Sequence, residues 1–195
     1  KVIDCTFNIS SLLKDRIEEI REEAETSVRE GSTCLILSDK NISSERASIP
    51  SILIVGAVHS HLVKLGLRGY CSLNVECSDA LDTHSFAVLI GVGATTVNPY
   101  LAIDSIFQRY EKNLFGKSNF ENCVIKFKKS IDAGLLKILS KMGISVISSY
   151  RGGCNFEAVG LSRAIVSDYF PGMSSRISGI GVKGIEKKIK ELHAK

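Results

Sequence analysis

The sequence lacks a hydrophobic run long enough to cross a lipid bilayer. Residues 49–63 are mostly apolar, but Ser51 and His59 interrupt them, and the run is shorter than the roughly 20 apolar residues of a membrane helix. The chain also lacks a positively charged leader with an apolar centre and a cleavage site. We therefore expect no membrane span and no secretion, and we predict a cytoplasmic location.

A disulfide framework is also missing. Six cysteines occur at irregular spacings in a chain that is 44% hydrophobic, which is enough to bury a core without cross-links. They are Cys5, Cys34, Cys71, Cys77, Cys123 and Cys154. This pattern predicts reduced thiols. Cys34 and Cys71 lie in apolar runs and are expected to be buried.

A strong charge of either sign is absent, since the formal net charge is only +4. Acidic residues outnumber basic ones seven to four between residues 12 and 30. The middle of the chain is basic through Lys126, Lys128, Lys129, Lys137 and Lys141. So weak a field argues against nucleic acid as a partner. The uneven charge suits a segment that packs against neighbours in a larger protein.

Strand-like and helix-like patterns alternate along the chain. Strands are predicted at residues 2–7, 33–37, 70–76, 92–97 and 144–148. Helices are predicted after Ser10 and Ser11, which suit an N-cap, and at residues 50–65, 83–90, 99–112 and 120–143. Residues 39–48 read as a loop. This alternation predicts an α/β fold with a mostly parallel sheet and flanking helices.

The last forty residues differ from the rest because they are rich in Gly and Ser, with a lysine-rich helix at 182–193. The length of 195 residues suits one domain or slightly more. We therefore expect an α/β core over residues 1–151 and a docking segment over residues 152–195.

Several short motifs, in order along the chain, resemble the large (alpha) subunit of glutamate synthase. They lie at residues 35–39, 55–59, 98–102, 140–145, 149–153, 155–161, 168–173 and 175–181. The resemblance covers nearly the whole chain and points to the central domain, where it leads toward the FMN-binding domain. It also implies a fold similar to an incomplete (β/α) barrel.

The resemblance implies a scaffold segment of an enzyme that converts glutamine, 2-oxoglutarate and reductant to two glutamates. The family's glutaminase begins with a nucleophilic cysteine, whereas this chain begins at Lys1, and the compact cysteine triplet of the family's 3Fe-4S cluster is absent. FMN and the cluster are thus implied for the intact enzyme and not for this segment. The implied partners are the glutaminase and FMN-binding domains, with ferredoxin or an NAD(P)H-dependent small subunit as electron donor. We assign no catalytic, cofactor-binding or metal-binding residue here.

Residues 179–184 fit the pattern G-x-G-x-x-G, in which glycines let the backbone approach a pyrophosphate. A dinucleotide site needs a preceding strand and an acidic residue about twenty positions later. Residues 174–178 are short and polar, so a tight turn before the last helix is favoured. Residues 177–189 also resemble a helix-hairpin-helix module, whose lysines would face DNA phosphates. A solvated terminal helix is the competing interpretation.

His59 and His61 suggest a metal site, but residues two apart on a helix point in nearly opposite directions. The family has a histidine between them where this chain has Ser60, so packing or capping roles are favoured. His84 also resembles a family histidine, without an assigned role.

Four further features have both a functional and a structural interpretation. Cys154 could be a reactive thiol at a helix N-terminus, but the sequence offers no nearby base. Residues 91–94 could approach a phosphate, although close backbone packing is favoured. Lys141 and Arg151 flank the predicted fifth strand and could face an anion, although inter-domain salt bridges are favoured.

Two alternatives to the scaffold hypothesis remain open from the sequence. The first is a freestanding α/β module that binds an anion or cofactor at its strand ends. The second is a DNA-binding protein that uses its helix-hairpin-helix-like C-terminus.

Overall fold

The computed structural model describes residues 1–153 and 155–194. Its centre is a four-stranded parallel sheet in the order β1-β3-β5-β6. The strands are β1 (Val2–Asp4), β3 (Cys34–Ser38), β5 (Ser72–Glu76) and β6 (Thr96–Asn98). Apolar side chains such as Ile3, Leu35 and Leu73 are fully buried, as expected of a sheet covered by helices. The predicted α/β class with a mostly parallel sheet is confirmed.

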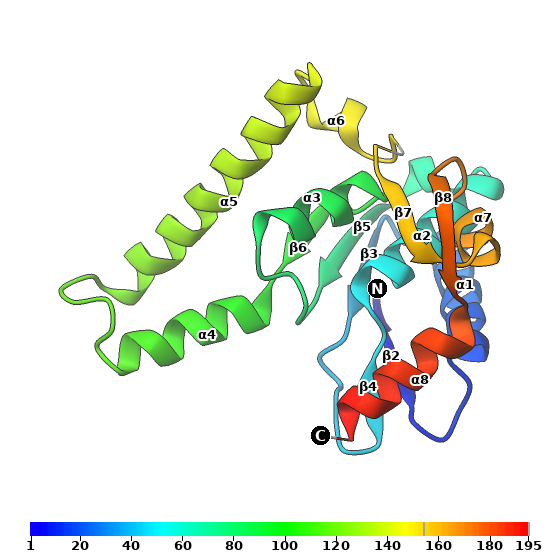
Figure 1. Ribbon diagram of the computed structural model, residues 1–195, viewed down its shortest axis with the longest axis horizontal. Coiled ribbons are helices and arrows are strands. Elements are labelled where there is room, and N and C mark those ends of the chain that lie inside the picture. Colours follow the sequence, from blue (N-terminus) through cyan, green and yellow to red (C-terminus); the bar gives the residue numbers. More distant parts are fainter. Residues whose placement is uncertain (154, 195) are drawn as a thin grey trace.

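Each strand of the sheet lies beside the one that precedes it in the chain, with helices between them. These helices are α1 (Leu13–Arg29), α2 (Ser51–Lys64) and α3 (Thr83–Gly91). A (β/α) barrel has the same sequential order before it closes. Here the sheet stays open, so the fold is similar to an incomplete barrel (Figure 1).

Helix α1 buries an apolar face that includes Leu13, Ile17 and Ile20, but it is not capped as predicted. Its N-cap is Leu12, whose side chain makes no capping bond. Ser10 and Ser11 instead bond to Asn8, and the free backbone N–H of Leu13 donates to Glu186 Oε2 at 2.9 Å. The carboxylate of Glu186 therefore caps the N-terminus of α1 in place of the predicted serine.

The first predicted strand and the predicted loop at 39–48 are both more complex than expected. The segment 2–7 divides into β1 and β2 (Thr6–Asn8), and the loop contains β4 (Arg46–Ser48). β2 and β4 form an antiparallel ribbon just beyond the carboxyl ends of β1 and β3. Arg46 fixes this ribbon through bonds to Asp4 Oδ2 at 3.0 Å and Thr6 Oγ1 at 2.8 Å.

Two long helices form an arm that extends from the body (Figure 1). They are α4 (Tyr100–Glu111) and α5 (Phe120–Met142), and α5 ends as predicted at Gly143 with φ +70°. The strand predicted at 144–148 is wrong. That stretch contains the short helix α6 (Ile147–Tyr150), and Val146 and Ile147 are exposed instead of paired. No helix among the described residues is long and apolar enough to cross a membrane.

The segment after Gly152 contains two strands that its composition did not predict. Its elements are β7 (Glu157–Leu161), α7 (Arg163–Tyr169), β8 (Ser174–Ile180) and α8 (Val182–His193). β7 and β8 pair in parallel with two irregularities in register. Helix α7 packs on α2, and α8 packs on α1 and β4, so this unit shares the main core.

Candidate functional site

Polar side chains gather at the carboxyl ends of the parallel strands, where open α/β sheets bind ligands. Glu76 at the end of β5 is central to this group. Its Oε2 accepts a bond from Ser38 Oγ at 2.7 Å, and its Oε1 accepts from Lys40 Nζ at 2.7 Å and Asn98 Nδ2 at 3.2 Å. The hydrogen bond from Lys40 is the main reason that the pKa of Glu76 lies below its ordinary value. The carboxylate is therefore charged and fully engaged.

Asp39 follows β3 directly and lies at the same edge of the sheet. It is only 4% exposed, and its Oδ2 accepts bonds from Ser48 Oγ at 2.9 Å and from the Ser78 hydroxyl and backbone N–H at 2.6 and 3.1 Å. Its buried Oδ1 has no hydrogen-bond partner among the described residues. Tyr100 lies nearby, and burial together with the Asp39 carboxylate raises the pKa of its hydroxyl.

This network leaves almost no room for a ligand. The cavity lined by Asp39, Glu76 and Cys77 measures about 10 Å³. That is space for roughly one water, whereas small-molecule sites occupy about 300 to 1,000 Å³. The polar groups bind one another and the β2–β4 ribbon. The arrangement holds the strand ends and the β2–β4 ribbon together.

A second polar cluster joins the body to the terminal segment. Arg21 of α1 is 5% exposed and donates to Ala57 O at 3.2 Å, to Asp168 Oδ2 at 3.2 Å and to Asp168 O at 3.4 Å. Its guanidinium lies 4.7 Å from the centre of the Tyr169 ring. We call Arg21, Asp168 and Tyr169 the anchor. Two members of the anchor, Asp168 and Tyr169, thus belong to residues 168–173, one of the stretches that carry the family resemblance.

Close packing supports the anchor. A Cβ on Gly56 of α2 would lie 2.8 Å from Tyr169 O and 2.7 Å from Phe170 Cδ1, distances that real Cβ atoms do not adopt. Glycine at this position therefore lets α7 approach α2 closely. The Ser60 hydroxyl adds a 3.1 Å bond to Asp168 O.

The anchor predicts a pH effect for Asp168→Asn. Burial alone would raise the pKa of Asp168, but bonds from Arg21 and Lys64 hold it below its ordinary value. A lowered folded-state pKa contributes stability above the unfolded value, about 3.9, which is lost as pH falls through the folded value. Because this side chain is 42% exposed, we expect Asp168→Asn to lose only about 1 kcal/mol near neutral pH. Urea unfolding at several pH values should show that loss shrink progressively as the pH falls below the unfolded-state pKa of about 3.9. A pH-independent difference would contradict the ion pair.

The predicted histidines occupy separate environments. His59 Nδ1 accepts a bond from Arg68 Nε at 3.1 Å, whereas His61 Nε2 lies 3.0 Å from Glu25 Oε2. The two rings thus face different partners, as their helical spacing predicts. No group of three or more potential metal ligands occurs among the described His, Cys, Asp and Glu residues. His84 lines an apolar cavity between α3 and β7.

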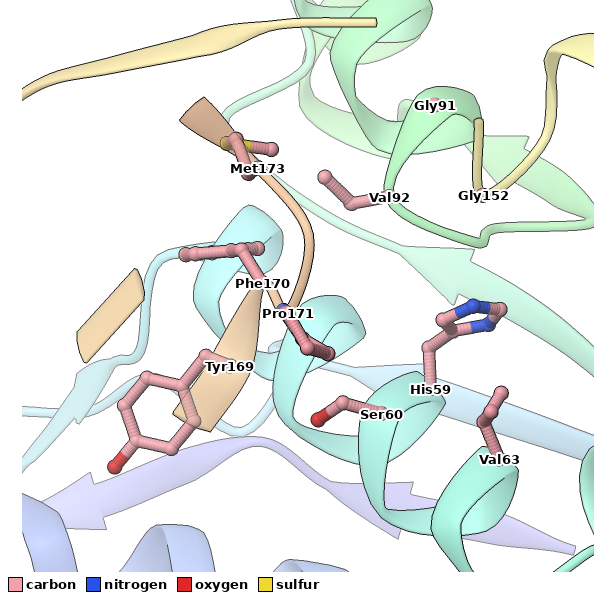
Figure 2. Close-up of a pocket in the computed structure, with 10 residues that line it drawn as sticks. All are labelled: His59, Ser60, Val63, Gly91, Val92, Gly152, Tyr169, Phe170, Pro171 and Met173. Atoms are coloured by element: carbon pink, nitrogen blue, oxygen red, sulfur yellow. The ribbon is translucent and has the colours of Figure 1, made fainter. Parts of the chain in front are cut away.

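His59 borders a cavity of about 160 Å³ between α2, the α3–β6 turn and the segment 169–173. In Figure 2 its ring lies on one side, near Gly152, and Phe170 and Met173 lie on the other. Sequence reasoning missed this cavity because its walls come from four separate stretches of the chain. Gly93, with φ +127°, passes so close to His59 that a side chain there would overlap the ring. The glycines of residues 91–94 therefore provide close packing.

The comparison with protein families decides what kind of segment this is. The family model "Glutamate synthase central domain" matches residues 1–162. The chain belongs to the glutamate synthase central domain family. A glutamate synthase [NADPH] large chain of Azospirillum brasilense is 57% identical over 195 residues, which cover 98% of this chain and 13% of that protein. This chain therefore spans about an eighth of the relative's length.

Relatives of the family differ in the electron donor that their names state. A ferredoxin-dependent glutamate synthase of Pyropia yezoensis is 41% identical over 193 residues, covering 93% of this chain and 12% of its own. A glutamate synthase [NADH] of Schizosaccharomyces pombe is 40% identical over 178 residues, covering 91% and 8%. A double variant of flavocytochrome b2 with sulfite bound shares the fold, with a TM-score of 0.51 and 14% identity over 85% of this chain and 46% of its own.

The five cysteines that the structure describes are free thiols. Cys5, Cys71, Cys77 and Cys123 are buried, while Cys34 is exposed, which corrects the expectation that it is buried. Burial raises the pKa of Cys77 to about 12 and also raises the pKa of Cys5, so both thiols are protonated near neutral pH. Cys154 lies outside the described residues.

Within the G-x-G-x-x-G residues, Gly181 alone connects β8 to α8, which agrees with the favoured tight turn before the last helix. The expectation that no strand precedes them is wrong, because β8 leads directly into Gly181 and α8. A Cβ on Gly179 would overlap Gly160 of β7, so this glycine permits strand pairing. A helix-hairpin-helix module needs a preceding helix, and here the preceding element is a strand. Lys190 is also engaged, with bonds to Ser11 O at 3.0 Å and Glu186 Oε1 at 2.7 Å.

Lys141 and Arg151 do not flank a strand, since none forms between them in the described structure. Lys141 is in the last turn of α5 and is exposed. Arg151 follows α6 and is partly buried, with its Nε fully buried.

Proposed function

We propose that this chain is a scaffold segment of a glutamate synthase and has no turnover alone. The intact enzyme would convert glutamine, 2-oxoglutarate and reductant to two glutamates. Family membership over residues 1–162 supports the parent, and coverage of only 13% of a relative's length supports a segment.

The closed carboxyl edge of the sheet carries the scaffold assignment. In enzymes of this architecture the catalytic residues lie at that edge, in loops that leave a pocket. Here Asp39 and Glu76 bind neighbouring side chains around a cavity of about 10 Å³. Side chains that fill the edge in this way hold the strand ends in fixed positions. They leave no room for a substrate between Asp39 and Glu76.

We further propose that residues 152–195 form the docking segment of a body made by residues 1–151. The anchor and Gly56 fix its first half, and Glu186 fixes its end against α1. The direction in which the chain leaves α8 is thereby set by the body. Such a fixed exit would position the FMN-binding domain relative to the glutaminase domain.

The partners in this proposal are those two domains and an electron donor. For each of NADPH, ferredoxin and NADH, one relative named for that donor is at least 40% identical to this chain. That similarity supports a segment that has the same role whether the enzyme receives electrons from ferredoxin or from an NAD(P)H-dependent small subunit. FMN and the 3Fe-4S cluster would belong to other parts of the enzyme, which we place in the cytoplasm.

A segment exchange tests the proposal. This chain replaces the matching residues of the Azospirillum brasilense large chain, and glutamine-dependent glutamate formation is measured beside glutamine hydrolysis. We expect the hybrid to keep both rates within about tenfold of the parent, since most homologous substitutions cost little stability. The 195-residue chain alone should show neither rate and should purify without flavin absorbance. Turnover by the chain alone, or stoichiometric flavin in it, would refute the scaffold role.

A further inference from the structure

Strand β8 is exposed along nearly its whole length. Every residue of Ser174–Ile180 except Ser175 is exposed to solvent. The strand runs beside β7 (Figure 1), and no strand among residues 1–153 and 155–194 pairs with its other edge. A parallel neighbour bonds only alternate residues, so about half of the backbone N–H and C=O groups of β8 lack a strand partner.

Apolar side chains of the β7–β8 ribbon are exposed beside this free edge. Val159 of β7 lies opposite Ile177 of β8, and the two residues are 63% and 61% exposed. Ile180, the last residue of β8, is 46% exposed. Parallel strands are normally buried on both faces, and a sheet of two strands is at best marginally stable by itself. The ribbon therefore has the features of a surface that another segment covers.

The comparison with relatives indicates where the covering segment comes from. The match to the central-domain model ends at residue 162, before β8 begins, yet the Azospirillum brasilense large chain aligns with 98% of this chain. Strand β8 is thus shared with a relative but lies outside the matched central domain, as expected of a strand at a junction with another part of the protein. The alignment covers only 13% of that relative, so most of its chain is available to supply a neighbour.

We propose that a β-strand from another part of the same large chain pairs with the free edge of β8 and extends the ribbon to three strands. Its backbone would bond the free N–H and C=O groups of β8, and its apolar side chains would pack against Ile177. A helix could not supply these bonds, because its own backbone groups bond one another. This inference rests on the proposed function, since it requires that the chain is a segment of a larger enzyme.

Hydrogen exchange followed by mass spectrometry tests the added strand. The peptide that contains β8 is compared between the 195-residue chain alone and the hybrid large chain of the segment exchange. About half of the β8 amides should exchange rapidly in the chain alone. In the hybrid these amides should exchange at least about tenfold more slowly, because a strand partner supplies their hydrogen bonds. Equal exchange in both would refute the proposal. If the hybrid does not fold, the matching peptide of the unmodified Azospirillum brasilense large chain is measured instead.

Photo-cross-linking identifies the partner of β8. The photoreactive amino acid p-benzoylphenylalanine replaces Ile177 in the hybrid, and the cross-linked peptides are sequenced. We expect a product with the mass of one large chain, joined to a peptide outside the exchanged segment. Cross-links to a small subunit, to a second large chain or to the exchanged segment itself would refute the proposal. Sedimentation of the 195-residue chain should show a monomer, and a dimer that protects the β8 amides would show that a second copy occupies the edge.

Two variants separate strand pairing from a general change in the hybrid. Ile177→Lys places a charge where the added strand would pack, so it should raise β8 exchange in the hybrid about tenfold and in the chain alone less than about twofold. The control Leu192→Lys, at a residue of α8 that is 68% exposed, should leave β8 exchange unchanged. Thermal unfolding shows that each variant is folded. Equal β8 exchange of both variants in an active hybrid would refute the added strand alone, whereas a folded hybrid that makes no glutamate would refute the scaffold role.

Discussion

Gly179→Ala is expected to destabilise the chain by about 2 to 3 kcal/mol, the range typical of overpacked interiors. A Cβ at this position would lie 2.7 Å from Gly160 Cα and closer still to Gly160 O. Backbone atoms, unlike a flexible side chain, cannot rotate away from the added methyl group. Strands β7 and β8 must therefore separate. Because β8 leads into α8, the loss extends to the contacts of the terminal helix. Urea unfolding followed by far-UV circular dichroism measures the effect.

Gly181→Ala is the matched control two residues later. Its nearest neighbour would be Ser162 Oγ at 3.8 Å, and its φ of −91° suits any residue. Only the modest preference for glycine over alanine at an N-cap is lost, about 1 kcal/mol or less. Equal losses for the two variants would show that Gly179 does not limit strand pairing. If instead the glycines served a nucleotide, both variants would be stable and only ligand binding would suffer.

Arg21→Met is expected to cost about 2 to 3 kcal/mol, because hydrogen bonds to a charged donor are each worth more than neutral ones. The substitution keeps an unbranched side chain but removes the bonds to Ala57 O and to both Asp168 acceptors. It also removes the stacking on Tyr169. The terminal segment would then be held mainly by apolar contacts. Chemical denaturation and limited proteolysis after residue 152 should both report the loosening.

Arg29→Met is the comparison for Arg21→Met on the same helix. Arg29 pairs with Glu25 at 2.8 Å, but its side chain is 55% exposed, so its loss should cost less than about 0.5 kcal/mol. Combining Arg21→Met with Asp168→Asn should give less than the sum of the single losses, because each removes the same ion pair. Strict additivity would mean that Arg21 stabilises the fold without Asp168.

The main sheet and its first helices could be predicted because their pattern is local. Apolar spacing places α1, Pro50 after a polar loop places α2, and apolar runs place β3 and β5. The pair β7–β8 could not be predicted, because most of β8 is exposed and carries serines and glycines that usually mark loops. Residues 144–148 were wrongly predicted to form a strand for the opposite reason. Their alternating apolar residues match a strand, but no neighbouring strand is available to pair with them.

The sites were less predictable than the fold because their members are far apart in sequence. Arg21 and Asp168 are separated by 147 positions, and no spacing rule connects them. Asp168 does belong to a stretch that carries the family resemblance, and this was the one signal pointing to it. His59 was singled out, but only the folded chain shows its partner, Arg68, whose Nε donates to His59 Nδ1 at 3.1 Å.

The bond between the Leu13 N–H and Glu186 joins positions 173 residues apart. A ribosome makes the chain from its amino end, so α1 emerges long before the carboxylate that completes its first turn. Until α8 is synthesised, this donor can bond only to water. Helix α1 therefore gains its full stability only when α8 docks on it, which couples the folding of two helices that lie far apart in the sequence.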